Sequence, residues 1–416
     1  MGKGRNKNRD NENTLAFGNA PKKKDKTEDF ESDSDESVST HITFDDDLQS
    51  VRGDIDGDEE TLIDTLSEHV DNATHKNIGI RTAALKHLLF GLTSRFLRDF
   101  IAKWRTTLID IATKGLRKTD EEVLLCASLL TLVSLQAGND VSGDIEDALA
   151  QLRVIVANPA KSEAIRAHCA LCLALATFVG TDSEESTIQA VRTLRQAWAG
   201  TKSTTTSWRL FDIALSGWAL LLQNCASEAF SSAVAEQPKI VSYLEANSME
   251  IRVVAGEVLS FLYEFVDEYQ EGFRFPNHNH LIEILGGLLS DSTKSKAKRD
   301  KRIQKFTLRQ VYSFINGGEF PSLKIKFSTQ ESLELNSCSS KLLYDLCTDL
   351  LRGGMMQQLK ENEFLRELFE LGPPAPPVTS DERISKAHRM AVHDAASKVR
   401  NQQRGKQRDK RMNIDY

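Results

Sequence analysis

A short signature recurs along the chain and constrains its fold more than any other feature. It is an apolar residue followed in four of five copies by arginine. The copies lie 43, 42, 43 and 43 residues apart: Ile80-Arg81, Val123-Leu124, Ile165-Arg166, Trp208-Arg209 and Ile251-Arg252. Each copy opens an apolar stretch with helical periodicity. A helix pair every ~40–47 residues is the period of armadillo and HEAT repeats.

A small residue stands four positions after the first member of most copies. The first, second, third and fifth copies have alanine or cysteine at this position, and the fourth has an aspartate. In order, the residues are Ala84, Ala127, Cys169, Asp212 and Ala255. A small side chain lets the helix approach its neighbour closely, and stacking is needed because no single pair can bury its apolar face. The fourth unit also contains a threonine-rich insert, residues 201–207, that we expect to form a loop.

A more amphipathic stretch precedes each signature and supplies the first helix of each pair. These stretches are Leu62–Val70, Phe100–Leu116, Ile145–Val156, Ile188–Trp198 and Phe230–Leu244. Residues 61–290 are therefore expected to fold as an armadillo/HEAT-like helical solenoid of about five helix pairs, and the fold class is all-α.

The repeat period fades after Asp267, and residues 281–289 read as a terminal half-repeat. We expect residues 291–372 to form a small C-terminal domain. It would contain a short β-hairpin within 316–336, where apolar and polar residues alternate, and helices near 341–351 and 364–371. Residues 373–379 form a proline-rich spacer, because glycine and prolines end a helix there. A basic helical tail is predicted for 380–416.

The net charge of −7 is an average over segments of opposite sign. Residues 1–60 are predicted to be a disordered tail, because they show little periodicity and few aromatic residues. This tail is basic over 1–26, with eight basic and three acidic residues, and acidic over 28–60, with fourteen acidic residues against one arginine. Ser32 and Ser34 lie in an acidic run of the kind that acidophilic kinases phosphorylate; a merely solvating run is the alternative.

Two later segments carry +7 each, residues 294–309 and 386–411. The apolar stripe of the tail stops at Val399, so residues 400–411 cannot be held by burial and need a charged partner. Phosphate contacts are expected from the basic residues of this tail: Lys386, Arg389, Lys398, Arg400, Arg404, Lys406, Arg408, Lys410 and Arg411. A secondary RNA contact, with a solvated helix face as the alternative, is assigned to Lys298, Arg299, Lys301, Arg302 and Lys305.

Motifs for chemistry are not found. Cys169 and Cys172 have C-x-x-C spacing but fall within an apolar repeat helix, so core packing is favoured over metal binding. His278 and His280 lack a paired carboxylate motif, and phosphate-binding, metalloprotease and hydrolase motifs are missing. We expect no enzyme, metal, cofactor, small-molecule substrate, transmembrane helix or secretory signal, and an intracellular protein.

Three segments resemble the interferon-related developmental regulator family: residues 32–41 ahead of the repeats, the stretch 364–373, and the ending 404–411. The resemblance covers nearly the whole chain. It implies a non-enzymatic regulator with an armadillo-like domain and a family-specific C-terminal domain. Members of the family are linked to transcriptional co-regulation and to binding of translationally inactive ribosomes, with a C-terminal helix in the mRNA path.

Two functions remain open at this point. In the first, the basic C-terminal helix binds ribosomes or RNA and represses translation by occupying the mRNA path. In the second, the solenoid groove binds partner proteins and the chain is a nuclear transcription co-regulator. The first implies the cytoplasm; residues 21–26 resemble a nuclear import signal, so a nuclear location stays open as well. Neither function involves a membrane.

Overall fold

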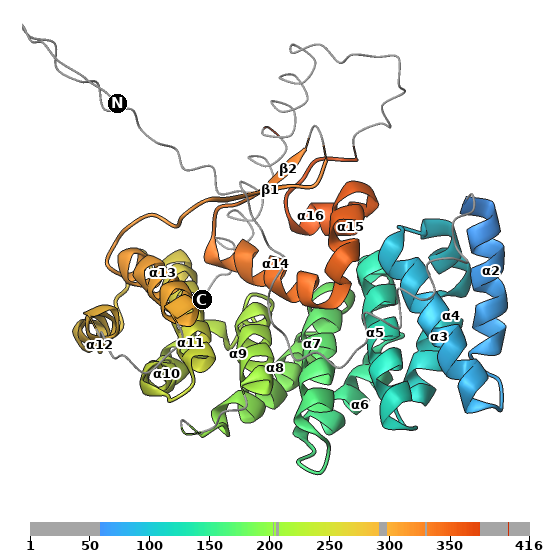
Figure 1. Cartoon of the computed structure of the whole chain (residues 1–416), viewed down its shortest axis with the longest axis horizontal. Coiled ribbons are helices and arrows are strands. Elements are labelled where there is room, and N and C mark those ends of the chain that lie inside the picture. Colours follow the sequence, from blue (N-terminus) through green and yellow to red (C-terminus); the bar gives the residue numbers. More distant parts are fainter. Residues whose placement is uncertain are drawn as a thin grey trace, which may run out of the picture. The chain divides into compact units, whose positions relative to one another are not determined.

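The structure is a computed structural model that describes residues 59–202, 204, 208–290, 298–328, 331–374 and 398. All of them belong to one compact unit. Figure 1 shows that helices dominate this unit and that they stack in sequence order from α2 to α13.

The five predicted helix pairs are present. The first helices of the pairs are α2 (Glu59–Asn72), α4 (Arg98–Gly115), α6 (Glu146–Ala157), α8 (Glu184–Ala199) and α10 (Ala229–Ser242). The second helices are α3 (Ile78–Ser94), α5 (Asp120–Ala137), α7 (Glu163–Gly180), α9 (Arg209–Leu222) and α11 (Met249–Tyr269). Short 3₁₀ turns follow α5 at Gly138–Val141 and α10 at Tyr243–Glu245. The armadillo-like, all-α fold predicted from the repeat is confirmed.

The second helices form the inner layer of the stack. Each contacts the next, from α3 through α5, α7 and α9 to α11, while α4 contacts α6 and α6 contacts α8 in a second layer. The small residues of the signature are fully or almost fully buried at Ala84, Ala127, Cys169 and Ala255. Helices α5 and α7 are long and apolar enough to cross a membrane, but both are largely buried inside the stack, as core helices are.

Side-chain caps set where most of the inner helices begin. Asn77, Thr119, Ser162 and Ser248 each accept a hydrogen bond from a backbone N–H in the first turn of the helix that follows. Such caps satisfy amide groups that have no partner within the helix. Helix α9 follows the threonine-rich insert and begins at Arg209, and its N-cap residue Trp208 makes no side-chain cap hydrogen bond.

The arginine of the signature joins its helix to the preceding loop. Arg81 donates from Nη1 to the carbonyl oxygens of His75 and Lys76, both at 2.8 Å. Arg252 makes the equivalent pair of bonds to two carbonyl groups of its own loop, at 2.5 and 3.1 Å. Arg209 departs from this role and donates to carboxylates instead. The fourth unit thus differs in its insert, its cap and its arginine.

A sixth pair closes the stack. Helix α12 (His278–Ser290) includes the predicted half-repeat, and α13 (Lys298–Ile315) packs against both α12 and α11. Leu308, Val311 and Ile315 of α13 are buried. Phe306 of the same helix is 53 % exposed. Helix α13 therefore continues the inner layer.

The segment after α13 folds back across the stack. Strands β1 (Leu323–Lys326) and β2 (Ser332–Leu335) form the predicted antiparallel hairpin, with Leu323 opposite Leu335. Helix α14 (Cys338–Leu351) contacts α7, α9 and α11, and a 3₁₀ turn at Arg352–Gly354 follows. Then α15 (Met355–Glu361) contacts α3 and α16 (Glu363–Leu368) contacts α5. Figure 1 shows α14 running across the ends of the inner helices.

Candidate nucleic-acid interface

Most of the predicted phosphate contacts lie outside the described residues. Of the nine basic residues assigned to the tail, Lys398 is described, and it is helical and exposed. The other eight, and the phosphorylation candidates Ser32 and Ser34, lie outside the part of the chain that the structure describes: Lys386, Arg389, Arg400, Arg404, Lys406, Arg408, Lys410 and Arg411.

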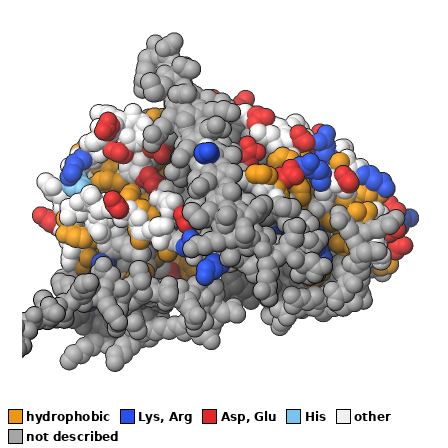
Figure 2. All heavy atoms as spheres, turned by 90° about the horizontal axis from the view of Figure 1, so that it is seen from above, with side chains coloured by type: hydrophobic (Ala, Val, Ile, Leu, Met, Phe, Trp, Pro, Cys, Tyr) orange, Lys and Arg blue, Asp and Glu red, His pale blue; other side chains and the backbone are white. Residues whose placement is uncertain are grey.

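The second basic segment lies on α13 at the end of the stack. Lys305 is half-buried and Arg309 is exposed. The same helix includes four further basic residues whose side chains lie outside the part of the chain that the structure describes: Lys298, Arg299, Lys301 and Arg302. Where Figure 2 leaves the surface uncovered by grey atoms, basic and acidic side chains are interspersed. That face of the folded body therefore has no large basic patch among its described residues.

Arg366 lies in the segment that precedes the basic tail, residues 355–374, which we call the root of the tail. Its side chain is 2 % exposed and makes an ion pair with Glu331 at 2.6 Å. Its guanidinium group also donates to three carbonyl oxygens, those of Leu359 at 2.8 Å, Gly372 at 2.7 Å and Pro373 at 3.1 Å. Because these carbonyls include those of Gly372 and Pro373, the last residue before the spacer and its first residue, Arg366 fixes the start of the spacer on the folded body.

Two amide side chains tie the root to the first repeats. Gln358 donates from Nε2 to the carbonyl oxygens of Leu92, Thr93 and Arg95 at 2.9–3.1 Å. Asn362 donates from Nδ2 to the carbonyl oxygen of Leu135 at 3.0 Å, and its Oδ1 caps α16. Both side chains are buried. These bonds satisfy carbonyl groups at the C-terminal ends of α3 and α5, where a helix leaves its last carbonyls without a partner of its own.

Close backbone approach accompanies these bonds. A Cβ on Gly354 would lie 2.5 Å from the carbonyl oxygen of Thr93, so only glycine fits there. Gly138 ends α5 with φ of +60°, and a Cβ on it would lie 2.9 Å from the ring of Phe364. An exposed ion pair between Arg98 and Glu363 joins the same surfaces, but such pairs contribute little to stability.

The beginning of α14 is fixed by a carboxylate of the repeat stack. Glu264 of α11 accepts the backbone N–H groups of Cys338 at 3.1 Å and Ser339 at 3.0 Å. Burial raises the pKa of Glu264 to about 7, although these two hydrogen bonds oppose the rise. Ser337 and Ser340 complete a capping box at the same helix end.

The fold-back of α14–α16 was not foreseen from the sequence. Together these helices cover inner helices α3, α5, α7, α9 and α11 on the side where they dock. Two signals were present in the sequence. Arg366 directly follows the apolar pair Phe364-Leu365, and Gln358 and Asn362 are two amide residues four positions apart.

The other sequence candidates occupy structural positions. Cys169 and Cys172 are buried in α7, and burial raises the pKa of the Cys172 thiol to about 12. His278 is hydrogen-bonded to the hydroxyl of Tyr263 at 3.0 Å and to Arg274 at 3.1 Å. Within the described ranges no group of three or more His, Cys, Asp or Glu side chains is placed to hold a metal ion.

Residues 31–316 match the family model of the interferon-related developmental regulator, and residues 362–412 match the model of the interferon-related protein conserved region. The second match begins at Asn362, the residue that anchors α16, and runs through the basic tail. The chain belongs to the interferon-related developmental regulator family. The resemblance noted in the sequence is thereby confirmed, and with it membership in a family of regulatory proteins.

Relatives in this family match most of the chain. Interferon-related developmental regulator 2 of Mus musculus is 31 % identical over 372 residues, covering 86 % of this chain and 84 % of its own. Interferon-related developmental regulator 1 of Homo sapiens is 30 % identical over 377 residues, covering 87 % and 83 %. Among solved structures, a designed armadillo repeat protein is 15 % identical, covers 58 % of this chain and 99 % of its own, and has a TM-score of 0.36.

Proposed function

We propose that this member of the interferon-related developmental regulator family binds ribosomes through its basic C-terminal helix and represses translation by occupying the mRNA path. The action is steric and needs no catalysis, metal or cofactor. Binding to ribosomes implies action in the cytoplasm. The observation that carries the proposal is the rigid root at Arg366, followed by a spacer and a segment of charge +7.

The charge pattern of the tail supports a nucleic-acid partner. Residues 386–411 contain nine basic and two acidic residues, and no apolar residue follows Val399 until Met412. Residues 400–411 have nothing apolar to bury against their own protein, whereas RNA phosphates supply the opposite charge along their length. An anchored root favours this further, since it limits the space that the tail must search before it binds.

The covered inner helices weigh against the alternative, a nuclear co-regulator that binds partner proteins in the solenoid groove. Helices α14, α15 and α16 contact the inner helices from α3 to α11, so a partner peptide would compete with the chain's own C-terminal segment. That segment is held by the buried hydrogen bonds of Gln358 and Asn362. Peptide binding in this groove would require its release.

The test is co-sedimentation of the full-length protein with purified ribosomes. One variant replaces five basic residues of the tail by glutamine: Arg404, Lys406, Arg408, Lys410 and Arg411. A matched variant replaces five basic residues of the α13 segment by glutamine: Lys298, Arg299, Lys301, Arg302 and Lys305. We expect the tail variant to lose at least tenfold in ribosome affinity, and the α13 variant to lose less than threefold.

A second readout separates occupancy of the mRNA path from binding elsewhere on the ribosome. The wild-type protein should inhibit cell-free translation and should be displaced by excess unstructured mRNA, whereas the tail variant should do neither. Equal co-sedimentation of the wild type and the tail variant would overturn the proposal. Retention of nuclear co-regulator complexes by the tail variant, without any ribosome binding by the wild type, would favour the alternative.

A further inference from the structure

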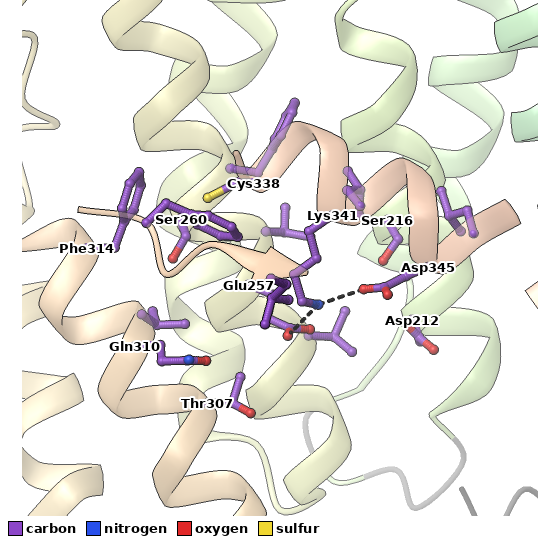
Figure 3. Close-up of a pocket in the computed structure, with 18 of the residues that line it drawn as sticks. Asp212, Ser216, Glu257, Ser260, Thr307, Gln310, Phe314, Cys338, Lys341 and Asp345 are labelled. Atoms are coloured by element: carbon purple, nitrogen blue, oxygen red, sulfur yellow. Dashed lines mark hydrogen bonds and ion pairs between the residues drawn. The ribbon is translucent and has the colours of Figure 1, made fainter. Parts of the chain in front are cut away.

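A cavity of about 370 Å³ lies where the last repeats meet the fold-back segment. Helices α9, α11, α13 and α14 and the chain before β1 line it (Figure 3). Much of the wall is apolar and aromatic, with contributions from Val258, Phe261, Phe314, Phe320, Pro321 and Leu342. Its volume is at the small end of the range for ligand sites, about 300–1,000 Å³, which suits one long side chain rather than a nucleotide cofactor.

The opposite wall of the cavity is acidic. Four carboxylates line it, those of Asp212, Glu257, Asp345 and Asp349. Lys341 lies between two of them, 3.1 Å from Glu257 and 2.6 Å from Asp345, as the dashed lines in Figure 3 show.

Arg209 bridges the other pair of carboxylates. It lies 2.9 Å from Asp212 and 2.8 Å from Asp349. Two cations thus face four carboxylates, which leaves a net charge of −2 when all six groups are ionised. Helix α13 contributes the uncharged Thr307 and Gln310 and adds no neutralising charge.

The excess of negative charge affects Asp212. The pKa of Asp212 is raised to about 7, chiefly by burial and in addition by the neighbouring carboxylates Asp349, Glu257 and Asp345, against the opposing effect of Arg209. Asp212 stands where the other repeats have a small residue, so the charge is a departure specific to this unit. A third cation in the cavity would relieve the repulsion among these carboxylates.

We infer that this cavity is a binding site for a lysine side chain of a basic peptide on a partner protein. The ammonium group would lie against the carboxylates, and its four-carbon stem would lie against Phe261, Phe314 and Leu342. Lysine fits better than arginine here, because an ammonium is a compact point charge and a guanidinium fork already occupies Asp212 and Asp349.

The cavity opens to solvent beside Asp345. The side chain of Asp345 is 53 % exposed, whereas that of Asp212, deeper in the site, is 18 % exposed. A peptide can therefore lie across α14 at the surface while one side chain enters past Asp345. The opening carries the charge that attracts the peptide, and the aromatic wall excludes water around the stem. This inference is independent of the proposed binding of RNA by the tail.

The experiment uses fluorescence anisotropy of a labelled nine-residue probe in which glycine and lysine alternate, titrated with the full-length protein. The wild type should bind the probe with at least tenfold higher affinity than it binds the same probe with Nε-acetylated lysines. Thr307→Trp fills the cavity and removes no charge, and we expect it to lower the affinity tenfold or more. Phe306→Trp, one residue away and outside the lining, should change the affinity less than twofold.

Two variants that each remove one carboxylate test the inference even if Thr307→Trp does not fold. Asp345→Asn removes a carboxylate at the opening, and Glu283→Gln removes one that is exposed on α12. Asp345→Asn should weaken binding at least threefold more than Glu283→Gln. Equal losses in these two variants, or unchanged binding by folded Thr307→Trp, would overturn the inference, since the acidic N-terminal tail would then account for the binding. Displacement of the probe by spermidine at lower concentration than by the unlabelled peptide would also overturn it, in favour of a free polyamine.

Discussion

Gln136 and Gln358 are far apart in the sequence, yet both donate to the carbonyl oxygens of Leu92 and Arg95. Gln136 lies 2.5 and 2.8 Å from these oxygens and Gln358 lies 2.9 and 3.0 Å from them. Each oxygen thus accepts a bond from the second repeat and one from the fold-back segment. The end of α3 is the point at which the repeat stack and the root of the tail are joined.

Replacement of Gln358 tests this junction. Gln358→Leu leaves the carbonyl of Thr93 without its side-chain donor and removes an acceptor from Asn362. We expect the free energy of unfolding to fall by about 1–3 kcal/mol, the cost of buried polar groups left without partners. Urea unfolding measures the loss. Gln357→Leu, on the adjacent and less buried side chain, should cost less than half as much; equal costs would contradict the role given to Gln358.

Two adjacent glycines give a matched pair for the close approach of the segment to α3. Gly354→Ala would bring a Cβ within 2.5 Å of the Thr93 oxygen, whereas a Cβ on Gly353 meets nothing within 4 Å. We expect Gly354→Ala to destabilise the protein by about 1–3 kcal/mol and to speed amide exchange in α15. Gly353→Ala should be neutral or slightly stabilising. Identical exchange rates in the two variants would exclude a tight contact at this point.

Arg366→Lys tests whether the fork of the guanidinium is needed at the root. One ammonium cannot bond Glu331 and three separate carbonyl groups at once, so buried oxygens lose their donors. We expect a loss of about 2–4 kcal/mol and faster proteolysis next to the spacer at 373–379. Limited proteolysis with mass spectrometry locates the cut. Unchanged cleavage in the variant would show that Arg366 does not hold the root.

The raised pKa values of Asp212 and Glu264, both about 7, predict that stability falls as pH rises. Each carboxyl keeps its proton to higher pH in the folded state than in the unfolded state. Unfolding therefore releases protons between about pH 4 and 7, and the free energy of unfolding decreases over this range.

Asp212→Asn should remove the share of Asp212 in this pH dependence. That share is on the order of 2 kcal/mol between pH 5 and 8. Chemical denaturation at several pH values provides the comparison, with Asp64→Asn, on the exposed face of α2, as the control. If the slopes of the wild type and Asp212→Asn agreed, the carboxyl of Asp212 would titrate normally.

The sequence predicted the repeat stack closely because each signature encodes a local event, a helix start and a buried small residue such as Ala127 or Cys169. The β-hairpin could be predicted from the alternation of apolar and polar residues within 316–336 alone. The fold-back of α15 and α16 depends on contacts between residues more than 200 positions apart, such as that of Asn362 with the carbonyl of Leu135, and short helices have no periodicity that reports them. For the same reason, the sequence showed Asp212 as an exception to the small residue of the repeat signature, but it did not predict the cavity that Asp212 lines.

The most direct test of the proposed function is the salt dependence of binding to a single-stranded RNA. Wild type and the variant with Arg404, Lys406, Arg408, Lys410 and Arg411 replaced by glutamine are compared in a plot of log affinity against log salt. Each lost phosphate contact lowers the slope by about 0.7, so the account predicts a slope shallower by about 3.5 in the variant. Parallel lines for the two proteins would contradict it, because the basic tail would then make no phosphate contacts.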